Sequence, residues 1–443
     1  MPDVTAGSVS GGPIVNPLRS PELAESVRRI RERATATGAL VFDPGDRRFH
    51  DDPASLYSEL REKNPIHKSP LGFWVLTRHA DCLAVLRDKR SSSDGRNVDP
   101  AAVGAPVIDQ PAEGPAAQMF DELAPFLFRD PPDHTRLRGL VQKAFTPRVI
   151  ESLRDRIVQI AGSLIDEALE RGGADLIADF AHPLPVRVIA ELLGVPEADL
   201  EIFKSWSDAL ARGLDPDFLL PPEAVNERTQ ALFSFVQYFG GLISERRDSL
   251  GDDLLSKLIE AEEGGVTLSQ GELISTCILI LVAGHETTVN LISSGTLELM
   301  RRPDQLRRFR GDESVVRSGV EEMLRYCSPV QMTGRVPLED IAIGDFVLKR
   351  GEFAMLLIGS ANRDPEVFDD PESFDISREE NPHLGFGFGI HHCLGAALAR
   401  LEAQVAISEL LRRTTSVELA TDDLTYKDNI VLRGLESLPV SIA

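Results

Sequence analysis

The chain has 443 residues, of which 42% are hydrophobic and 26% are charged, the balance of a folded protein rather than a disordered one. Its length allows one large domain or two or three small ones. With 47 basic and 70 acidic residues the formal net charge is −23, which disfavours binding to nucleic acid or to an anionic membrane through the overall field.

The N-terminal residues 1–40 are predicted to form a flexible extension, and residues 41–443 a single domain. Within the extension, residues 22–33 have helical spacing. The chain starts with Gly-, Ser- and Pro-containing sequence instead of a basic start and an apolar run, so no signal peptide is expected. No stretch approaches the roughly 20 consecutive apolar residues of a membrane-spanning helix. We therefore expect a cytoplasmic protein.

The first half of the domain is predicted to combine short strands with many helices. A strand is expected at residues 73–77 and a helix at 78–87. An irregular segment rich in Ala, Pro and Gly follows at 97–128, and loops of this length are usually functional. Helical spacing then extends over 132–171 with a break before Pro147, because proline suits the first position of a new helix. Further helices are predicted at residues 186–193, 197–212, 222–247 and 252–263.

The second half contains one long helix, predicted at residues 269–301. Its nearly all-apolar centre indicates burial on all sides. Residues 329–357 are predicted to form strands, and 417–442 short strands. Other helices are expected at residues 304–309, 314–326 and 394–412. The predicted fold class is mainly α with small β sheets.

The strongest functional signal is the sequence Phe-Gly-Phe-Gly-Ile-His-His-Cys-Leu-Gly at residues 386–395, directly before a predicted helix. A cysteine at this position, Cys393, gains thiolate stability from the helix dipole and from free N–H groups. The glycines let the backbone adopt positive φ and approach a flat ligand closely. A thiolate surrounded by such donors suits one axial position of an iron ion.

Two other interpretations of this loop are weaker. A phosphate-binding loop is disfavoured because the Lys-Ser/Thr of a P-loop is missing. A zinc site is disfavoured because the adjacent His391, His392 and Cys393 cannot all converge on one tetrahedral ion. The four cysteines are widely spaced and form no Cys-x-x-Cys pair, so the sequence does not indicate a disulfide framework. The other three cysteines are expected to be small buried hydrophobes: Cys82, Cys277 and Cys327.

Three further motifs each have a plain structural explanation. Glu322 and Arg325 lie three apart, the spacing of a routine surface pair on a helix. Residues 283–288, Ala-Gly-His-Glu-Thr-Thr, interrupt the apolar centre of the long helix. Glycine costs about 1 kcal/mol there relative to alanine, and a buried acid needs a partner, so a kink with a solvated acid is the simple alternative. His134 and Arg138, four apart, could form an exposed polar face.

The segment 386–395 resembles the haem-binding loop of the cytochrome P450 family, Phe-Gly-x-Gly-x-His-x-Cys-x-Gly, with every fixed position filled. The other motifs follow in the family's order from about residue 55 to the end. The resemblance implies the cytochrome P450 fold, with haem b between the long central helix and the cysteine loop and final helix. It makes Cys393 the iron ligand. The implied haem contacts are His134, Arg138, Arg335, Phe386, Gly387, Gly389, His391 and Gly395.

The same resemblance gives roles to the remaining motifs. Thr287 would hydrogen-bond dioxygen, and Glu286 would help to deliver protons. Relatives often have Pro-Ala-Gly where this chain has Leu-Lys-Arg-Gly at 348–351, which leaves one outer hairpin in doubt. The catalytic groove is implied to consist of Ala283, Gly284, Glu286 and Thr287. The structural triad that supports the haem loop is implied to be Glu322, Arg325 and Arg378.

The function implied by the resemblance is that of a soluble bacterial-type haem monooxygenase in a haem-thiolate domain at residues 41–443. It would insert one atom of dioxygen into an apolar small molecule, by hydroxylation or epoxidation. Electrons would come from a separate ferredoxin and an NAD(P)H-dependent ferredoxin reductase. The basic residues expected to dock the ferredoxin are Arg136, Lys143 and Arg400. A monomer is expected.

Two alternatives of different kinds stay open. One is a hydrogen-peroxide-driven peroxygenase of the same fold, which the Glu286-Thr287 pair disfavours. The other is a non-catalytic haem-binding sensor, which would not require Thr287 in a buried helix. Natural products, steroids, terpenoids and fatty acids are all candidate substrates. The family's substrate contacts correspond to residues 97–128, 209–223 and the strand after Pro329.

Overall fold

The structure is a computed structural model that describes residues 40–44, 46, 48–103, 122–215, 220–263 and 266–443. The predicted helix at residues 22–33 lies outside the described residues. So do residues 104–121 of the predicted irregular segment, and the prediction of a flexible extension at 1–40, apart from its last residue.

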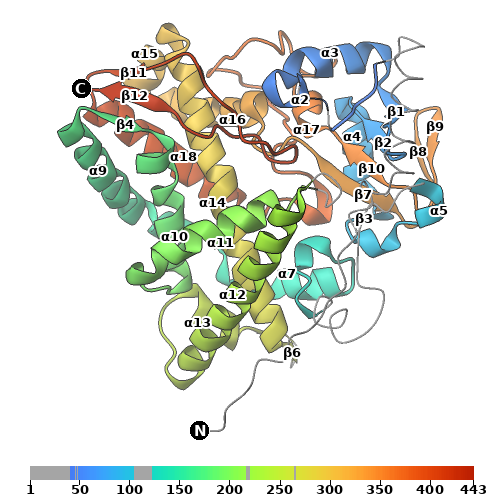
Figure 1. Ribbon diagram of the computed structural model, residues 1–443, viewed down its shortest axis with the longest axis horizontal. Helices are drawn as coiled ribbons and strands as arrows, with labels where there is room; N and C mark the ends of the chain where they lie inside the picture. The colour runs from blue at the N-terminus through green and yellow to red at the C-terminus, as the bar shows by residue number, and fades with distance from the viewer. Residues whose placement is uncertain (1–39, 45, 47, 104–121, 216–219, 264–265) are drawn as a thin grey trace.

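The long helix α14 (Gln270–Met300) runs through the middle of the molecule (Figure 1). A capping box fixes its start: the Ser269 hydroxyl accepts from the Glu272 N–H, and the Glu272 carboxylate accepts from the Ser269 N–H. The helices packed against it are α10 (Pro183–Leu193), α11 (Leu200–Arg212), α12 (Pro222–Asp248), α16 (Val316–Cys327) and α18 (Ala396–Arg413). The expected central, buried helix is present within one residue of its predicted ends.

By length and composition alone, helix α14 is long and apolar enough to cross a membrane. The sequence did not predict this, because the helix contains no run of roughly 20 consecutive apolar residues. However, 67% of its most apolar window is buried inside the molecule. A helix that is apolar all round and covered by neighbouring helices is typical of the core of a large protein. The apolar side chains of α14 therefore serve the core.

The other described helices surround this centre. The predicted break before Pro147 is present, because the Thr146 hydroxyl accepts from the Val149 N–H and starts a new helix there. The bounds are α2 (Arg48–Asp51), α3 (Pro53–Lys63), α4 (His79–Arg87), α5 (Pro100–Val103), α7 (Asp133–Ala144), α8 (Pro147–Ser152), α9 (Arg154–Arg171), α13 (Leu254–Glu260), α15 (Pro303–Gly311) and α17 (Ile358–Ala361).

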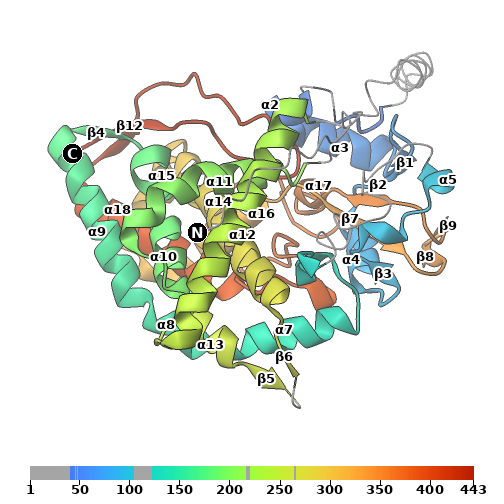
Figure 2. The same cartoon turned by 60° about the horizontal axis from the view of Figure 1, so that its bottom comes forward.

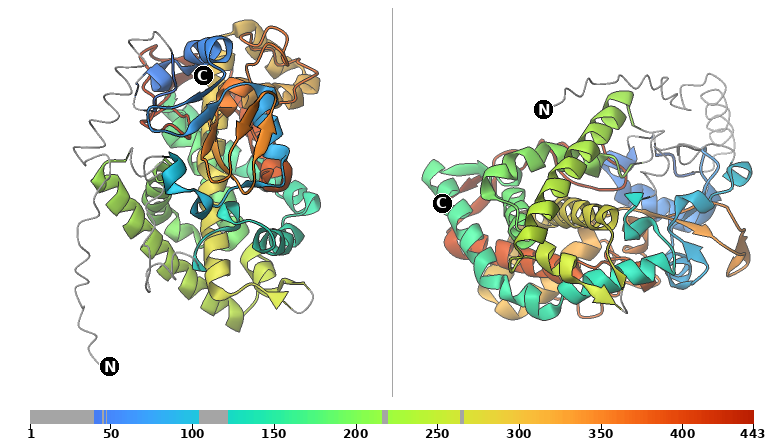
Figure 3. Two further views of the ribbon diagram at one scale, coloured as in Figure 1. Left: turned by 90° about the vertical axis from the view of Figure 1, so that its right-hand side faces the viewer. Right: turned by 90° about the horizontal axis from the view of Figure 1, so that it is seen from below.

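A five-stranded sheet lies at one side of the helical body, where Figure 2 shows it beside α3, α4 and α17, and the left view of Figure 3 shows its blue and orange strands. Its order is β1 (Ile66–Lys68), β2 (Trp74–Leu76), β10 (Ala354–Leu356), β7 (Thr333–Pro337) and β3 (Ser91–Ser92). Strands β2 and β10 pair in parallel although about 280 residues separate them, and the other pairs are antiparallel. The sheet thus brings Arg335 on β7 into the same region as the N-terminal part of the domain.

Three small β elements complete the fold. A three-stranded sheet joins β11 (Val417–Leu419), β12 (Pro439–Ile442) and β4 (Gly173–Asp175). Hairpins are formed by β5 (Glu262–Glu263) with β6 (Val266–Thr267), and by β8 (Ile341–Ile343) with β9 (Phe346–Leu348). The second is the hairpin that the Leu-Lys-Arg-Gly sequence left in doubt; it forms with Leu348 buried and with Gly351 at φ 77°. Mainly α with small sheets is the observed class.

Two predicted elements differ from the structure. The helix expected at residues 252–263 is shorter, because α13 ends at Glu260 and the β5–β6 hairpin follows. Asp253 caps its start by accepting from the Ser256 N–H, and the two glycines in the sequence at 264–265 disfavour helix. The second element that differs is the region 417–442, which was expected to form short strands. It has strands only at its two ends, β11 and β12.

Candidate active site

The cysteine loop has the backbone that its glycines predict. Gly387 and Gly389 have φ of 67° and 73°, and a Cβ at Gly389 would lie 2.6 Å from the Leu86 carbonyl oxygen. The Cys393 N–H donates to the Phe386 carbonyl oxygen at 2.9 Å and closes the loop before α18. Other residues at the two glycines would strain the chain, so the loop conformation depends on them.

The sulfur of Cys393 has the surroundings of a thiolate ligand. The residue is exposed at the protein surface, but the protein beside its sulfur desolvates the thiol, and this influence is the largest, so the pKa is raised on balance. The N–H groups of Gly395 and Ala396 and the cations Arg138 and Arg400 act in the opposite direction, because each favours the anion. Gly395 has an ordinary φ of −81°, and its contribution in this structure is this N–H donor.

The other cysteines lack such surroundings. Cys82 and Cys277 are buried and Cys327 is half-buried, whereas Cys393 is exposed. Burial raises the pKa of the Cys277 thiol to about 12, and raises those of Cys82 and Cys327 further. These three are structural cysteines, as expected from sequence.

A group of basic side chains gathers beside the loop. The rings of His134 on α7 and His391 lie 4.3 Å apart between centroids, and the Ser93 hydroxyl lies 3.1 Å from His391 Nε2. His134 is buried, yet neither of its ring nitrogens has a hydrogen-bond partner, and the same holds for Nδ1 of His391. Arg138, one turn after His134, donates to the His392 carbonyl oxygen at 2.5 Å. Helix α7 is thereby attached to the cysteine loop.

Arg138 and Arg335 give this group positive charge. Arg335 is buried, and its guanidinium donates to the Thr333 hydroxyl and the Gly334 carbonyl oxygen. Burial lowers the pKa of Arg335 to about 10. Burial, and then the charge of Arg335, lower the pKa of His391 to about 3. Among the described residues, no carboxylate forms an ion pair with Arg138 or Arg335, so a ligand that carries carboxylates fits here.

The exposed face of α14 is the second part of the site. Ala283 is exposed and Gly284 and Thr287 are half-buried, whereas His285 and Glu286 between them are buried. Residues four apart share one face of a helix, so Ala283 and Thr287 lie together on it. The Thr287 hydroxyl donates to the Ala283 carbonyl oxygen at 2.9 Å.

Gly284 has a packing role as well. A Cβ at this position would lie 3.0 Å from Cγ1 of Ile189 on α10. The small residue therefore allows α10 and α14 to approach closely. This close contact with Ile189 is the reason for a glycine at position 284 that the structure shows.

Glu286 points into the protein, away from the exposed face. Its side chain is 2% exposed, and Oε1 accepts from Lys427 Nζ at 2.6 Å. Burial raises the pKa of Glu286, but Lys427, together with the nearby His285 and His182, outweighs it and holds the pKa below its usual range. Lys427 was not predicted, because it lies 141 positions away in an irregular segment with no motif of its own.

The structure brings Glu322, Arg325 and Arg378 together. Arg325 Nε and Nη2 each donate to one carboxylate oxygen of Glu322 at 2.7 Å, and both side chains are fully buried. Arg378 Nε donates to the same carboxylate at 3.2 Å. Arg325 also donates to the carbonyl oxygens of Asn362, Pro371 and Ser373. All charges are paired, as burial requires.

Asn362 connects this network to the cysteine loop and was also not predicted. Its side-chain oxygen accepts from the Leu384 N–H at 2.7 Å, and its amide donates to the Ser328 hydroxyl at 2.9 Å. Because Leu384 lies directly before the loop, the buried network holds the segment that leads to Cys393 in place.

The basic residues expected to dock a ferredoxin are differently placed. Arg136 is paired with Glu272, and Arg400 donates to Glu321 at 2.6 Å, so the charge of both is partly neutralised. Lys143 is exposed on α7. Of the segments expected to contact substrate, residues 104–121 and 216–219 lie outside the described part of the chain.

The comparisons with known proteins agree on one family. A family model described as Cytochrome P450 matches residues 198–432. The polyketide biosynthesis cytochrome P450 PksS of Bacillus subtilis is 43% identical over 416 residues, which are 91% of this chain and 99% of that protein. The 6-deoxyerythronolide B hydroxylase of Saccharopolyspora erythraea is 38% identical over 89% of this chain and 97% of that protein.

A solved structure is equally similar. P450BioI, in complex with acyl carrier protein ligated to hexadec-9Z-enoic acid, superimposes with a TM-score of 0.82 at 40% identity, over 89% of this chain and 99% of that chain. Haem b, the cofactor of this fold, fits the residues present: Cys393 can bind its iron, and the uncompensated basic group can bind its propionates. The chain belongs to the cytochrome P450 family and is a haem monooxygenase.

Proposed function

We propose that this monooxygenase hydroxylates or epoxidises an apolar natural product of polyketide or fatty-acyl type, with electrons from a separate ferredoxin and its reductase. The substrate class is supported by the names of similar proteins: PksS is named for polyketide biosynthesis, another relative is a 6-deoxyerythronolide B hydroxylase, and P450BioI binds an acyl carrier protein ligated to a fatty acid. The observation that carries the oxygenase chemistry is the exposed face of α14, where Ala283 and Thr287 lie side by side.

The bound haem supplies the iron at which dioxygen is activated, and the protein supplies position and protons. Cys393 is the anionic ligand, held by backbone donors of α18. Arg138, Arg335, His134 and His391 hold the propionates. The small, apolar side chain of Ala283 gives the substrate an apolar surface to contact.

Thr287 acts as a hydrogen-bond acceptor on that surface. A hydroxyl has one hydrogen to donate and two lone pairs. The hydrogen is committed to the Ala283 carbonyl oxygen, so the lone pairs are available to a water molecule on the exposed face. Thr287 thereby holds a proton source in the oxygen-activating region.

Glu286, which directly precedes Thr287 in sequence, forms an acid–base pair with Lys427. The Lys427 ammonium is 28% exposed, whereas the Glu286 carboxylate is 2% exposed. The pair thus connects solvent to the buried side of α14. We assign it the supply of protons to the Thr287 side, through rotation of the Glu286 side chain.

The supply of electrons is proposed to involve the surface around Cys393. Lys143, Arg400 and Arg136 are the cations proposed to dock an acidic ferredoxin, and Arg400 and Arg136 contribute less because they pair with Glu321 and Glu272. A cytoplasmic monomer is part of the same proposal, and gel filtration of the holoprotein tests the oligomeric state.

The experiment that tests this function is a screen of the haem-loaded protein with polyketide lactones, fatty acids, steroids and terpenoids. A ligand that displaces water from iron shifts the Soret band from the low-spin to the high-spin position. We expect the largest shifts with polyketides or fatty acyl compounds, and a product that contains label from labelled dioxygen only when ferredoxin, reductase and NADPH are present. Turnover with hydrogen peroxide alone, and none with ferredoxin and its reductase, would contradict the proposal and favour a peroxygenase.

A further inference from the structure

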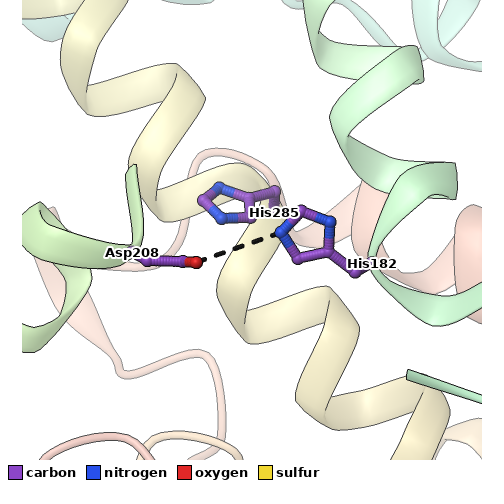
Figure 4. Close-up of side chains that lie close together, drawn as sticks. All are labelled: His182, Asp208 and His285. Atoms are coloured by element: carbon purple, nitrogen blue, oxygen red, sulfur yellow. Dashed lines mark ion pairs between the residues drawn. The ribbon is translucent and has the colours of Figure 1, made fainter. Parts of the chain in front are cut away.

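Three side chains with metal-binding chemistry converge on the buried side of α14. His182 lies at the start of α10, Asp208 lies on α11 and His285 lies on α14. Figure 4 shows the three side chains pointing toward one another from these three helical segments. One ligand atom from each lies within 4.8 Å of the other two, and His182 Nε2 is 3.9 Å from Asp208 Oδ1.

His285 is oriented as a metal ligand. Its Nδ1 lies 3.0 Å from the Leu281 carbonyl oxygen, one turn earlier in α14, so Nδ1 carries the proton and Nε2 the lone pair. Metal-binding histidines in general donate their second nitrogen in this way, which fixes the tautomer and the ring. Nε2 has no hydrogen-bond partner, although His285 is 1% exposed. A buried, unpartnered lone pair requires an explanation.

His182 repeats the pattern. It is 8% exposed, and its Nε2 also has no hydrogen-bond partner. Burial, and then the nearby His285 and Lys204, lower the pKa of His182 to about 4.

Asp208 provides charge and access. Its side chain is 45% exposed, so an ion can reach the cluster from solvent on this side. Burial, and then repulsion from Glu286, raise the pKa of Asp208. Glu286 Oε2 has no hydrogen-bond partner and lies 4.0 Å from His285 Nε2. A divalent cation between these groups would relieve the repulsion between the two carboxylates.

We propose that His182, Asp208 and His285 bind a Zn²⁺ ion, with water as the fourth ligand. Two imidazole nitrogens and a carboxylate suit zinc, whereas Mg²⁺ and Ca²⁺ prefer oxygen ligands. Tetrahedral coordination at about 2.1 Å brings ligand atoms to roughly 3.4 Å from one another, so each atom moves by about an ångström or less. The side chains can supply this, because the ion-pair contacts of these ligand atoms within the described part of the chain, His182 Nε2 with Asp208 Oδ1 at 3.9 Å and His285 Nε2 with Glu286 Oε2 at 4.0 Å, are longer than hydrogen bonds.

The site is separate from the haem site. His285 is buried on α14, whereas Ala283 and Thr287 form the exposed face of the same helix. A bound ion would join α11 to α14 and to the start of α10. The inference does not depend on the substrate or on the electron donor proposed above.

The test is equilibrium dialysis of the haem-loaded, chelator-treated protein against Zn²⁺, with metal analysis. We expect one zinc per haem at micromolar concentration, no competition from Mg²⁺ and an unchanged Soret band. X-ray absorption at the zinc edge should show nitrogen and oxygen ligands at about 2.0–2.1 Å and no sulfur, which excludes binding to a cysteine.

Variants separate the ligands from the fold. Asp208→Asn changes an exposed residue and should weaken zinc binding at least about tenfold without loss of haem or stability. His182→Gln should do the same. Glu201→Gln, at an exposed acid on the same helix α11, is the matched control and should bind as the wild type does. Wild-type protein that takes up no zinc, or Asp208→Asn and His182→Gln proteins that bind it unchanged, would overturn the proposal.

Discussion

Lys427 Nζ lies 2.6 Å from Oε1 of Glu286, although 141 positions separate the two residues in sequence. Glu286 directly precedes Thr287, the residue on the exposed face of α14. The carboxylate has lost almost all contact with water, so its charge depends on this ammonium group. This pair is the largest of the influences that favour the charged form of the acid in the central helix, and the nearby His285 and His182 add to it.

Replacing Lys427 with methionine leaves Glu286 buried without its cation. We expect a loss of roughly 1–3 kcal/mol of unfolding free energy at neutral pH, less than for a fully buried pair because Lys427 is partly exposed. The folded-state pKa of Glu286 should then rise above its unfolded value, so the deficit should grow as the pH rises from about 4.5 toward 8. Denaturant titrations at several pH values measure this. The double variant with Glu286→Gln should recover much of the loss, and a deficit independent of pH would contradict the account.

Thr287→Ala removes the hydroxyl from the exposed face of α14. We expect haem and substrate binding to be retained, while product formed per NADPH falls by roughly tenfold or more and hydrogen peroxide appears, because proton supply is lost. Thr288→Ala is the matched control: its hydroxyl donates to the Gly284 carbonyl oxygen from a buried position. Equal coupling in wild type and Thr287→Ala would show that the hydroxyl has no part in the chemistry.

Glu322→Gln breaks the fully buried pair with Arg325. Arginine then keeps its charge in the interior without a carboxylate, at a cost of about 3 kcal/mol or more. Thermal unfolding and the haem content of the purified protein should both fall. Glu313→Gln, at an exposed position shortly before α16, should change stability by no more than about 0.5 kcal/mol. A stable, haem-replete Glu322→Gln protein would remove the network from the support of the cysteine loop.

Glu321 should make the protein sensitive to acid. Burial raises its pKa, but hydrogen bonds from His383 and Arg400 outweigh this and lower the pKa to about 2. Because the folded pKa is depressed, the stabilisation is complete above the unfolded value near 4.5 and is lost as the pH falls toward 2, by up to about 3 kcal/mol. Unfolding followed from pH 6 to 3 in wild type and Glu321→Gln checks this. The unfolding free energy of the Glu321→Gln protein should fall less steeply with acid than that of the wild type. Equal pH dependence in the two proteins would contradict this role of Glu321.

The parts of the site that are contiguous in sequence could be predicted, and the parts that depend on distant contacts could not. The loop at 386–395 carries its glycines, its cysteine and the start of its helix together. The positions of Ala283 and Thr287 on one face follow from helical spacing alone. Lys427 and Asn362 meet their partners through the tertiary fold, and no local pattern marks them.

The same reasoning explains the misplaced details. The resemblance placed Gly284 in the catalytic groove, but its contact with Ile189 depends on the position of α10, which the sequence does not show. Arg136 and Arg400 are basic in sequence, yet glutamates from other helices pair with them. Charge can be counted from sequence, but its neutralisation depends on packing.

The absorbance of the reduced carbon monoxide complex is the most direct test of Cys393 as the thiolate ligand. Wild-type protein should show the red-shifted Soret band of thiolate-bound haem, Cys393→Ala should lose it, and Cys327→Ala, at a structural cysteine, should retain it. A Cys393→Ala protein that keeps the red-shifted band, or a wild-type protein that binds no haem, would contradict the account.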